Sequence, residues 1–357
     1  MPFFSFLHIV TYVKQKGGNG MFYFQHLLRK KRLAAVMLLL LCVCTFGGCG
    51  KKDDLTTVKL TEVAHSIFYV PMYVAIEEGY FAEEGIDLQL TNGLGADKTM
   101  TAVLSGDADI GFMGSEASIY VYNEGAEDYV VNFAQLTQRA GNFLVAREAD
   151  GAFDWQKLKG TTVVGGRAGG MPQMVLEYIL KKHGIDPKTD LTIIQNIDFG
   201  VTSQAFAAGT GDYTVEFEPA ATALEADESG YVVASLGVES GYVPYTAFSA
   251  KKSYIEKNPD IIEGFVKALQ RGMDYTAEHT PEELAKVIQP QFKETDLETL
   301  TTIITRYYEQ DTWKKDLIFE EDAFTLLQDI LEEAGELEKR VPYEELVDTT
   351  YARKVVE

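Results

Sequence analysis

The chain has 357 residues, of which 46% are hydrophobic, and it carries a formal net charge of −22. So acidic a chain lacks the basic surface that nucleic acids require, and anionic lipid headgroups would repel it. All three cysteines lie near the N-terminus, at positions 42, 44 and 49, so the rest of the chain has neither a disulfide nor a thiolate metal site. About 300 residues follow, enough for two lobes with hydrophobic cores of their own.

The N-terminal segment has the pattern of an export signal. Residues 1–48 contain no Asp or Glu, and the basic run 29–32 precedes an apolar run, 33–46, that is too short to span a membrane comfortably. We predict a signal peptide over residues 1–48. Residues 1–20 are surplus to it and indicate a misassigned start codon. The alternative is an uncleaved signal anchor.

The residues at the end of this segment indicate how the exported chain is held. Phe46-Gly47-Gly48-Cys49 resembles a bacterial lipobox, in which Cys49 would be lipidated and become the new N-terminus. Residues 49–57 would then form a lipidated tether. We therefore expect the protein at the cell membrane, anchored by lipid, on the extracellular face or on the periplasmic side of a double-membrane bacterium.

Short strands and helices alternate along the rest of the chain. The first unit has a strand at 60–64, a loop, a helix at 71–84 that Pro71 opens, and a strand at 86–90. Such units form parallel sheets, whose binding sites lie at the carboxyl ends of the strands. The alternation continues with helices at 96–105 and 115–124 and strands at 110–113, 130–136 and 142–146.

The alternation restarts after a loop at 154–160, where we place a crossover into a second lobe. This lobe has predicted strands at 161–164, 191–195, 213–216 and 231–234 and helices at 172–183, 201–208 and 219–225. A strand at 245–250 returns to the first lobe, and helices follow at 259–278, 281–288, 297–308 and 320–333. We therefore predict an α/β fold in which lobe I comprises 58–146 plus 246–357 and lobe II comprises 147–245.

Four stretches carry a family resemblance. They are PMYVAIEEGYFAEEGIDLQL (71–90), LSGDADIGFMGSEASI (104–119), LKGTTVVGGRAGGMPQMVLEYILKKHGIDP (158–187) and GDYTVEFEPAATALE (211–225). In this order they resemble the type II extracellular solute-binding proteins of ABC importers, in the branch that serves sulfonates, taurine, nitrate and the pyrimidine precursor of thiamine. The resemblance implies a two-lobed clamshell of the periplasmic-binding-protein type II, with a helical C-terminal region. It also implies a monomer that captures a small-molecule solute without chemistry and hands it to a permease and its ATPase.

Candidate ligand contacts in lobe I follow its strands. Ser66, Phe68 and Tyr69 lie in the loop after the first strand, where the two rings could stack on a flat ligand. Ser115 and Glu116 follow the third strand, where Ser115 would cap a helix and the Glu116 carboxylate would favour an amine or ring N–H over an anion. The alternatives are core packing for the two rings and simple capping for Ser115 and Glu116.

Candidate contacts in lobe II lie in two loops. Gly169, Gly170 and Met171 precede a helix, so their backbone could approach a ligand. The surrounding glycine-rich stretch matches neither a Walker loop nor a dinucleotide fingerprint. Glu218 precedes Pro219, and the resemblance places this pair at the cleft, as a contact to ligand, for closure or for permease docking.

The crossovers between the lobes supply the last candidates. Arg139 and Asn142 lie where the chain leaves lobe I, and Tyr245 lies where it returns. Polar and aromatic residues beside a hinge can reach a ligand. Hydrogen bonding within the hinge itself is the alternative for all three.

The sequence offers no catalytic constellation. No His, Asp and Glu spacing builds a metal site, and no Ser stands in a nucleophile elbow. We therefore predict a binding protein that is not an enzyme and has no cofactor. The alternative from another class is a relative that synthesises the thiamine pyrimidine. The resemblance attaches a Cys-rich segment to that class, whereas Cys49 is the last cysteine here.

The composition of the predicted cleft favours one ligand class. Tyr69, Glu116 and Glu218 face only Arg139 and Arg167 as candidate cations, which suits a thiamine-precursor aminopyrimidine better than an anion. An aliphatic sulfonate, taurine or a nitrate-like oxyanion is the alternative, because helix N-termini can hold an anion without arginine. A sensing or adhesion lipoprotein without a permease is a further alternative.

Overall fold

The computed structural model describes residues 55–356. The predicted signal peptide, Cys49 and all but the end of the predicted tether lie outside this part of the chain. Within it, no helix combines the length and the apolar character that crossing a membrane requires.

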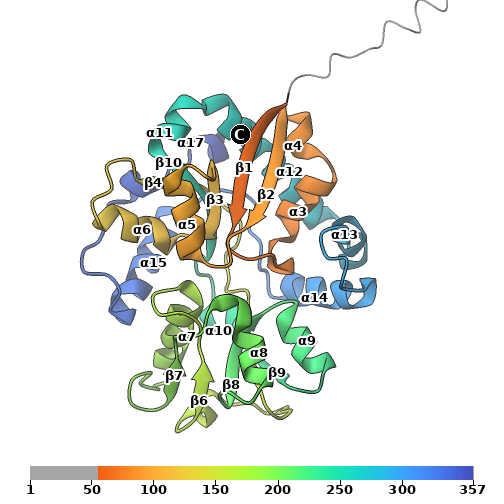
Figure 1. The fold of residues 1–357 in the computed structure, drawn as a ribbon, viewed down its shortest axis with the longest axis vertical. Helices are drawn as coiled ribbons and strands as arrows, with labels where there is room; N and C mark the ends of the chain where they lie inside the picture. The colour runs from red at the N-terminus through yellow and green to blue at the C-terminus, as the bar shows by residue number, and fades with distance from the viewer. Residues whose placement is uncertain (1–54, 357) are drawn as a thin grey trace, which may run out of the picture. The chain divides into compact units, whose positions relative to one another are not determined.

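The described residues form two five-stranded mixed sheets, one in each lobe (Figure 1). In the first sheet β1 pairs in parallel with β2 and β3, and β10 runs antiparallel between β3 and β4. Its order is β2 (Ile86–Asn92), β1 (Thr56–Glu62), β3 (Ile110–Gly114), β10 (Thr246–Lys251) and β4 (Val130–Gln135). The second sheet has the order β7 (Thr192–Ile194), β6 (Thr162–Val164), β8 (Tyr213–Phe217), β5 (Asn142–Ala146) and β9 (Tyr231–Ser235).

The place of β5 corrects the domain boundaries predicted from the sequence. Residues 142–146 were assigned to lobe I, but β5 pairs antiparallel with β8 and β9 in the second sheet. The chain therefore crosses between Gln135 and Asn142, well before the loop at 154–160. Every residue of β5 is buried, and a strand buried on both faces has no alternation that could indicate its partners.

A second correction concerns the helix predicted at 71–84. The structure divides it into α3 (Val70–Glu77) and α4 (Tyr80–Glu83). Gly79 between them has φ +75°, a left-handed conformation that glycine adopts without steric cost. The 3-10 turn η1 (Ile67–Tyr69) precedes α3, so the loop after β1 is short and tightly wound.

Helices cover the sheets. Those inserted between strands are α5 (Ala96–Ser105), α6 (Glu116–Asn123), α7 (Met171–Lys182), α8 (Thr202–Ala207), α9 (Ala220–Ala226) and α10 (Leu236–Ser240), with short 3-10 turns η2 (Trp155–Leu158) and η3 (Phe199–Val201). The C-terminal region adds α11 (Lys252–Lys257), α12 (Pro259–Glu278), α13 (Pro281–Ile288), α14 (Leu297–Glu309), α15 (Glu321–Ala334), α16 (Tyr343–Leu346) and α17 (Thr350–Val356). The predicted helical C-terminal region is thereby confirmed.

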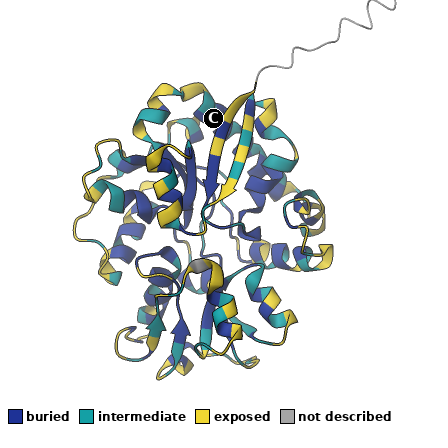
Figure 2. Cartoon of the chain, in the orientation of Figure 1, coloured by how far each residue is buried: buried dark blue, intermediate teal, exposed yellow. Residues whose placement is uncertain are grey.

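The core of lobe I is aromatic. Phe112 of β3 stacks on Phe248 of β10 with ring centroids 4.1 Å apart, and Phe248 meets Phe265 of α12 at 5.4 Å. All three side chains are buried. Buried residues follow the strands and the inward faces of the helices in Figure 2. Burial of these large rings holds the sheet against α12.

The packing of α12 on α3 gives a first prediction. A Cβ at Gly272 would lie 2.2 Å from the Pro71 carbonyl oxygen, whereas one at Gly264 of the same helix would lie 3.3 Å from its nearest neighbour. We expect Gly272→Ala to lower the free energy of unfolding by about 1–2 kcal/mol, because the steric clash exceeds the gain in helix propensity. Gly264→Ala is the matched control and should change it less. Urea unfolding measures both, and an unchanged or raised stability of Gly272→Ala would contradict this packing.

Candidate functional site

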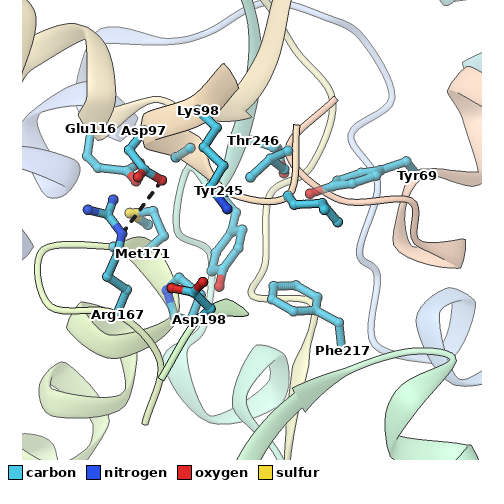
Figure 3. A pocket seen from close by; sticks show the side chains of 17 residues that line it. Tyr69, Asp97, Lys98, Glu116, Arg167, Met171, Asp198, Phe217, Tyr245 and Thr246 are labelled. Carbon is cyan, nitrogen blue, oxygen red and sulfur yellow. Dashed lines mark ion pairs between the residues drawn. The ribbon is translucent and has the colours of Figure 1, made fainter. Parts of the chain in front are cut away.

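A first cavity lies between the lobes and contains about 720 Å³ of empty space, its open mouth included. Figure 3 shows its side chains. Those contributed by lobe I include Tyr69, Asp97, Lys98, Glu116 and Thr246, and those contributed by lobe II include Arg167, Met171, Asp198 and Phe217. Tyr245 lines the cavity from the crossover directly before β10. The wall residues come from the ends of β3 and β8, the start of β10 and the N-terminus of α7, as the carboxyl-end rule for parallel sheets leads one to expect.

The Glu116 carboxyl group is the deepest charged group in this cavity. Glu116 is 2% exposed, and a Cβ at Gly114 would lie 2.1 Å from its Oε2 atom, so only glycine leaves room for the carboxyl group there. Burial raises the pKa of Glu116 from 4.5 to about 7, and the backbone N–H groups of Glu116 and Met171 partly oppose the rise. Oε2 accepts no hydrogen bond from residues 55–356.

Aromatic side chains form another part of the wall. Tyr69 from lobe I, Tyr245 at the crossover before β10 and Phe217 from lobe II line the cavity. The Tyr245 hydroxyl donates to Asn142 Oδ1 at 3.1 Å, which leaves its oxygen able to accept. Burial raises the pKa of both tyrosines well above their ordinary value, so both phenols stay protonated at neutral pH.

Four charged side chains stand at the rim. Asp97 and Lys98 of α5 and Arg167 and Asp198 of lobe II are all exposed and all line the cavity. Arg167 Nε lies 3.9 Å from Asp97 Oδ1 across the two lobes (Figure 3). The rim therefore carries charges of both signs, screened by solvent, whereas the interior carries the single carboxyl group of Glu116.

A second cavity, with about 830 Å³ of empty space, adjoins the first. The two share Leu94, Pro172 and Phe217. Ser66 lines the second cavity and bridges the lobes, since its hydroxyl donates to the Glu218 carbonyl oxygen at 2.6 Å. Glu218 is 1% exposed.

The Glu218 side chain is held from the C-terminal region. It accepts hydrogen bonds from Arg306 Nη1 and the Thr222 N–H, each at 2.9 Å. Burial nevertheless raises the pKa of Glu218, an effect that Thr222 and Arg306 reduce. Glu216, which also lines this cavity, has a pKa of about 7 for the same reason, although Thr214 and Thr202 donate to it.

The sequence-predicted site residues divide into three sets. Those at the first cavity are Tyr69, Glu116, Gly170, Met171 and Tyr245. Those at the second cavity are Ser66 and Glu218. Those lining neither cavity are Phe68, Ser115, Arg139, Asn142 and Gly169.

Two residues of the third set lie in lobe I. Phe68 is fully buried and packs at 5.0 to 5.7 Å on four rings, which is the core role left open above. Ser115 precedes α6, but its side chain makes no capping bond, because its backbone is already helical and turns the hydroxyl away from the N–H groups.

The other three belong to the lobe II side. The Arg139 guanidinium lies over Tyr242 and donates to the Gly237 carbonyl at 3.1 Å. Asn142 is buried beside Tyr245, and its Oδ1 atom orients the Tyr245 hydroxyl. The Gly169 carbonyl accepts from Tyr120 at 2.9 Å, so it joins the two lobes.

Several residues at the site were missed from the sequence. Asp97 and Lys98 lie just after the glycine-containing stretch 91–95 that ends β2, and that stretch was a usable signal for a loop at the cleft. Asp198 follows β7 without any such mark. Arg306 has no signal at all, since it lies in an ordinary amphipathic helix 88 residues after Glu218.

The chain matches the family model "NMT1/THI5 like" over residues 67–283. It belongs to the NMT1/THI5-like family. Over 309 residues it is 49% identical to "Putative binding protein YtlA" of Bacillus subtilis (strain 168), a match that covers 87% of this chain and 92% of the relative. The family assignment therefore rests on sequence over most of the chain.

The chain also has two weaker similarities. A "4-amino-5-hydroxymethyl-2-methylpyrimidine phosphate synthase" of Candida albicans (strain WO-1) is 24% identical, with 61% of this chain and 66% of the relative covered. The alkanesulfonate-binding protein SsuA of Xanthomonas axonopodis pv. citri, solved with MOPS bound, superposes with a TM-score of 0.68 at 14% identity, over 82% of this chain and 98% of that one. The predicted two-lobed α/β fold of the periplasmic-binding-protein type is confirmed.

The buried carboxyl group of Glu116 gives a second prediction. Its folded-state pKa lies above the unfolded value, so its protonated form favours the folded state, and stability is lost as pH rises from 4.5 through 7. We expect Glu116→Gln, in ligand-free protein, to exceed wild type in free energy of unfolding by about 3 kcal/mol at pH 8 and by little at pH 5. Urea titrations at both pH values measure the difference.

Glu124, exposed at the end of the same helix, supplies the control. The difference between Glu124→Gln and wild type should change little between the two pH values. A pH-independent difference for Glu116→Gln would show that this carboxyl group is ordinarily solvated.

Proposed function

We propose that this protein is the solute-binding component of an ABC importer, which captures a small organic solute between its two lobes and delivers it to a permease and its ATPase. Membership of the NMT1/THI5-like family, similarity to a Bacillus subtilis protein named as a putative binding protein and a cavity walled by both lobes support the proposal. Capture requires no chemistry, because a solute buried between two walls needs only complementary contacts.

The ligand we propose is an aminopyrimidine of the thiamine-precursor type. One observation carries this choice: the only charged group deep in the first cavity of the described chain is the Glu116 carboxyl group, whose Oε2 has no hydrogen-bond donor in residues 55–356. A buried acceptor without a donor costs about 1–3 kcal/mol. A ligand N–H group at this position would remove that cost, whereas an oxyanion would add like-charge repulsion.

An aminopyrimidine can satisfy both carboxyl oxygens at once. Its exocyclic N–H donates to one oxygen, and one proton is shared between the other oxygen and the adjacent ring nitrogen. The pair therefore needs one proton, held either by the carboxyl group or by the ring. The pKa of about 7 at Glu116 makes that proton available near neutral pH. The rings of Tyr69, Tyr245 and Phe217 supply apolar surface for a flat heterocycle.

An aliphatic sulfonate or another oxyanion is the second candidate. Lys98 and Arg167 at the rim of the first cavity favour it, as does the fold shared with the alkanesulfonate-binding protein. Both cations are exposed and stand beside Asp97 and Asp198. Their attraction is therefore weaker, per charge, than the effect of the buried Glu116 carboxylate.

A synthase role is the alternative from another class, because the Candida albicans relative carries a synthase name. This chain has no cysteine after Cys49, which is the reason we propose binding without chemistry. Formation of a pyrimidine phosphate by the purified protein would contradict the proposal.

Binding of 4-amino-5-hydroxymethyl-2-methylpyrimidine tests the ligand assignment by calorimetry. We expect wild-type affinity to fall about tenfold per pH unit above the Glu116 pKa, and to fall again at acid pH where the free ring nitrogen is protonated as well as Glu116, because the complex holds one proton. Glu116→Gln should lack the fall above the Glu116 pKa, because an amide accepts and donates at the same two positions. Glu116→Ala should bind at least about tenfold more weakly at pH 6.

Asp198→Asn at the rim is the control and should keep the wild-type pH profile. Two results would contradict the ligand assignment. One is that taurine or an alkanesulfonate binds while the pyrimidine does not. The other is that Glu116→Gln keeps the wild-type pH dependence of pyrimidine binding.

We also propose that Cys49 carries the lipid anchor, on the basis of Phe46-Gly47-Gly48-Cys49. Cys49→Ser should move the protein from the membrane fraction to the medium or the periplasm, because the acidic chain has little affinity of its own for anionic lipid. Cell fractionation and immunoblotting measure this. Cys42→Ser, within the predicted signal peptide, is the control and should stay at the membrane. A membrane-bound Cys49→Ser protein would favour the uncleaved signal anchor.

A further inference from the structure

The second cavity plays no part in the capture of a pyrimidine ring, although it is as large as the first. The three residues common to both, Leu94, Pro172 and Phe217, are all apolar. The two cavities therefore adjoin at these apolar side chains.

Two polar residues that line the second cavity, His65 and Ser66, face protein acceptors. The Ser66 hydroxyl donates to the Glu218 carbonyl oxygen at 2.6 Å. His65 Nδ1 lies 2.8 Å from Glu62 Oε1 and His65 Nε2 lies 2.9 Å from the Gln291 carbonyl oxygen. The Glu62 hydrogen bond raises the pKa of His65. Both ring nitrogens of His65 therefore face partners within the protein.

The buried polar groups that remain at this cavity are acceptors. Glu216 and Glu218 line it and are 4% and 1% exposed. Glu216 receives one hydrogen bond on each oxygen, from Thr214 at 2.6 Å and Thr202 at 3.0 Å. A carboxylate oxygen can accept more than one hydrogen bond, so Glu216 keeps capacity for a donor on a ligand.

The cation nearest to these carboxylates is already shared. Arg306 lies 2.9 Å from Glu218 Oε1 and 3.0 Å from Glu225 Oε2, and it does not line the cavity. Lys98 and Arg167 stand at the rim of the first cavity and do not line the second. An anion in the second cavity would therefore meet the like charge of two buried carboxylates.

We propose that the second cavity is a subsite for a substituent of the ligand that donates hydrogen bonds and carries no negative charge, such as a hydroxyl, amide or ammonium group. This inference rests on the proposed function, because it places the pyrimidine ring in the first cavity. Its consequence is selection against phosphorylated pyrimidines. The protein would take the free alcohol or amine and reject the phosphate ester of the same ring.

The test compares 4-amino-5-hydroxymethyl-2-methylpyrimidine with its phosphate ester by calorimetry at one pH, about pH 8. Wild type should bind the alcohol at least about a hundredfold more tightly, since like charges juxtaposed in a buried site cost several kcal/mol. Glu216→Gln should narrow this ratio by about tenfold, chiefly by tightening the ester, because it removes one charge and keeps the shape.

Two further variants make the result independent of how Glu216→Gln folds. Ser203 lines the second cavity and is partly exposed, so Ser203→Lys places a cation there and should also tighten the ester. Asp227, exposed after α9 and lining neither cavity, is the matched control for total charge. Asp227→Asn should leave the ratio at its wild-type value.

The possible failures are distinguishable. Equal wild-type affinities for alcohol and ester would overturn the subsite and leave the proposed function standing. A preference for the alcohol that neither Glu216→Gln nor Ser203→Lys narrows would also overturn the subsite, because the selection would then arise elsewhere. Binding of neither pyrimidine would overturn the proposed ligand class, and the subsite with it.

Discussion

The desolvated carboxyl group of Glu116 is the constraint around which the cleft is arranged. Its place depends on both lobes: α6 carries it, the absent Cβ of Gly114 leaves room for it, and the Met171 N–H at the start of α7 faces it from lobe II. Because burial raises its pKa to about 7, the group can be charged or neutral under physiological conditions. A ligand that donates a hydrogen bond and shares a proton there gains the hydrogen-bond energy that the carboxyl group lacks in the protein alone.

The lobes are fastened to each other around that group by polar contacts of the backbone. Ser66 of lobe I donates to the Glu218 carbonyl, and Tyr120 of lobe I donates to the Gly169 carbonyl. From the C-terminal region, Arg306 of α14 joins Glu218 to Glu225. These contacts set the spacing between the two walls, so the shape of both cavities depends on hydrogen bonds that differ little in strength from those to water. Such contacts suit a cleft that must also open.

Much of the fold could be predicted from local pattern. Apolar periodicity and Gly or Pro punctuation predicted the helices α12 and α13 at their observed bounds. Local pattern does not show which distant segments pack against each other. The burial of every residue of β5 left no pattern that could indicate which sheet it joins. The side chain of Phe68 packs in a cluster of rings from segments that are distant in the sequence. Glu116 was found because it follows a strand, whereas Arg306 is brought to Glu218 only by the tertiary fold.

The most direct test of this account counts protons. Calorimetry of 4-amino-5-hydroxymethyl-2-methylpyrimidine at pH 8, in buffers of different ionisation enthalpy, measures the protons taken up on binding. The account predicts uptake of nearly one proton by wild type, because Glu116 is mostly ionised above its pKa of about 7 and the paired complex holds one proton. It predicts almost none for Glu116→Gln. Binding by wild type without proton uptake would contradict the central role given to this carboxyl group.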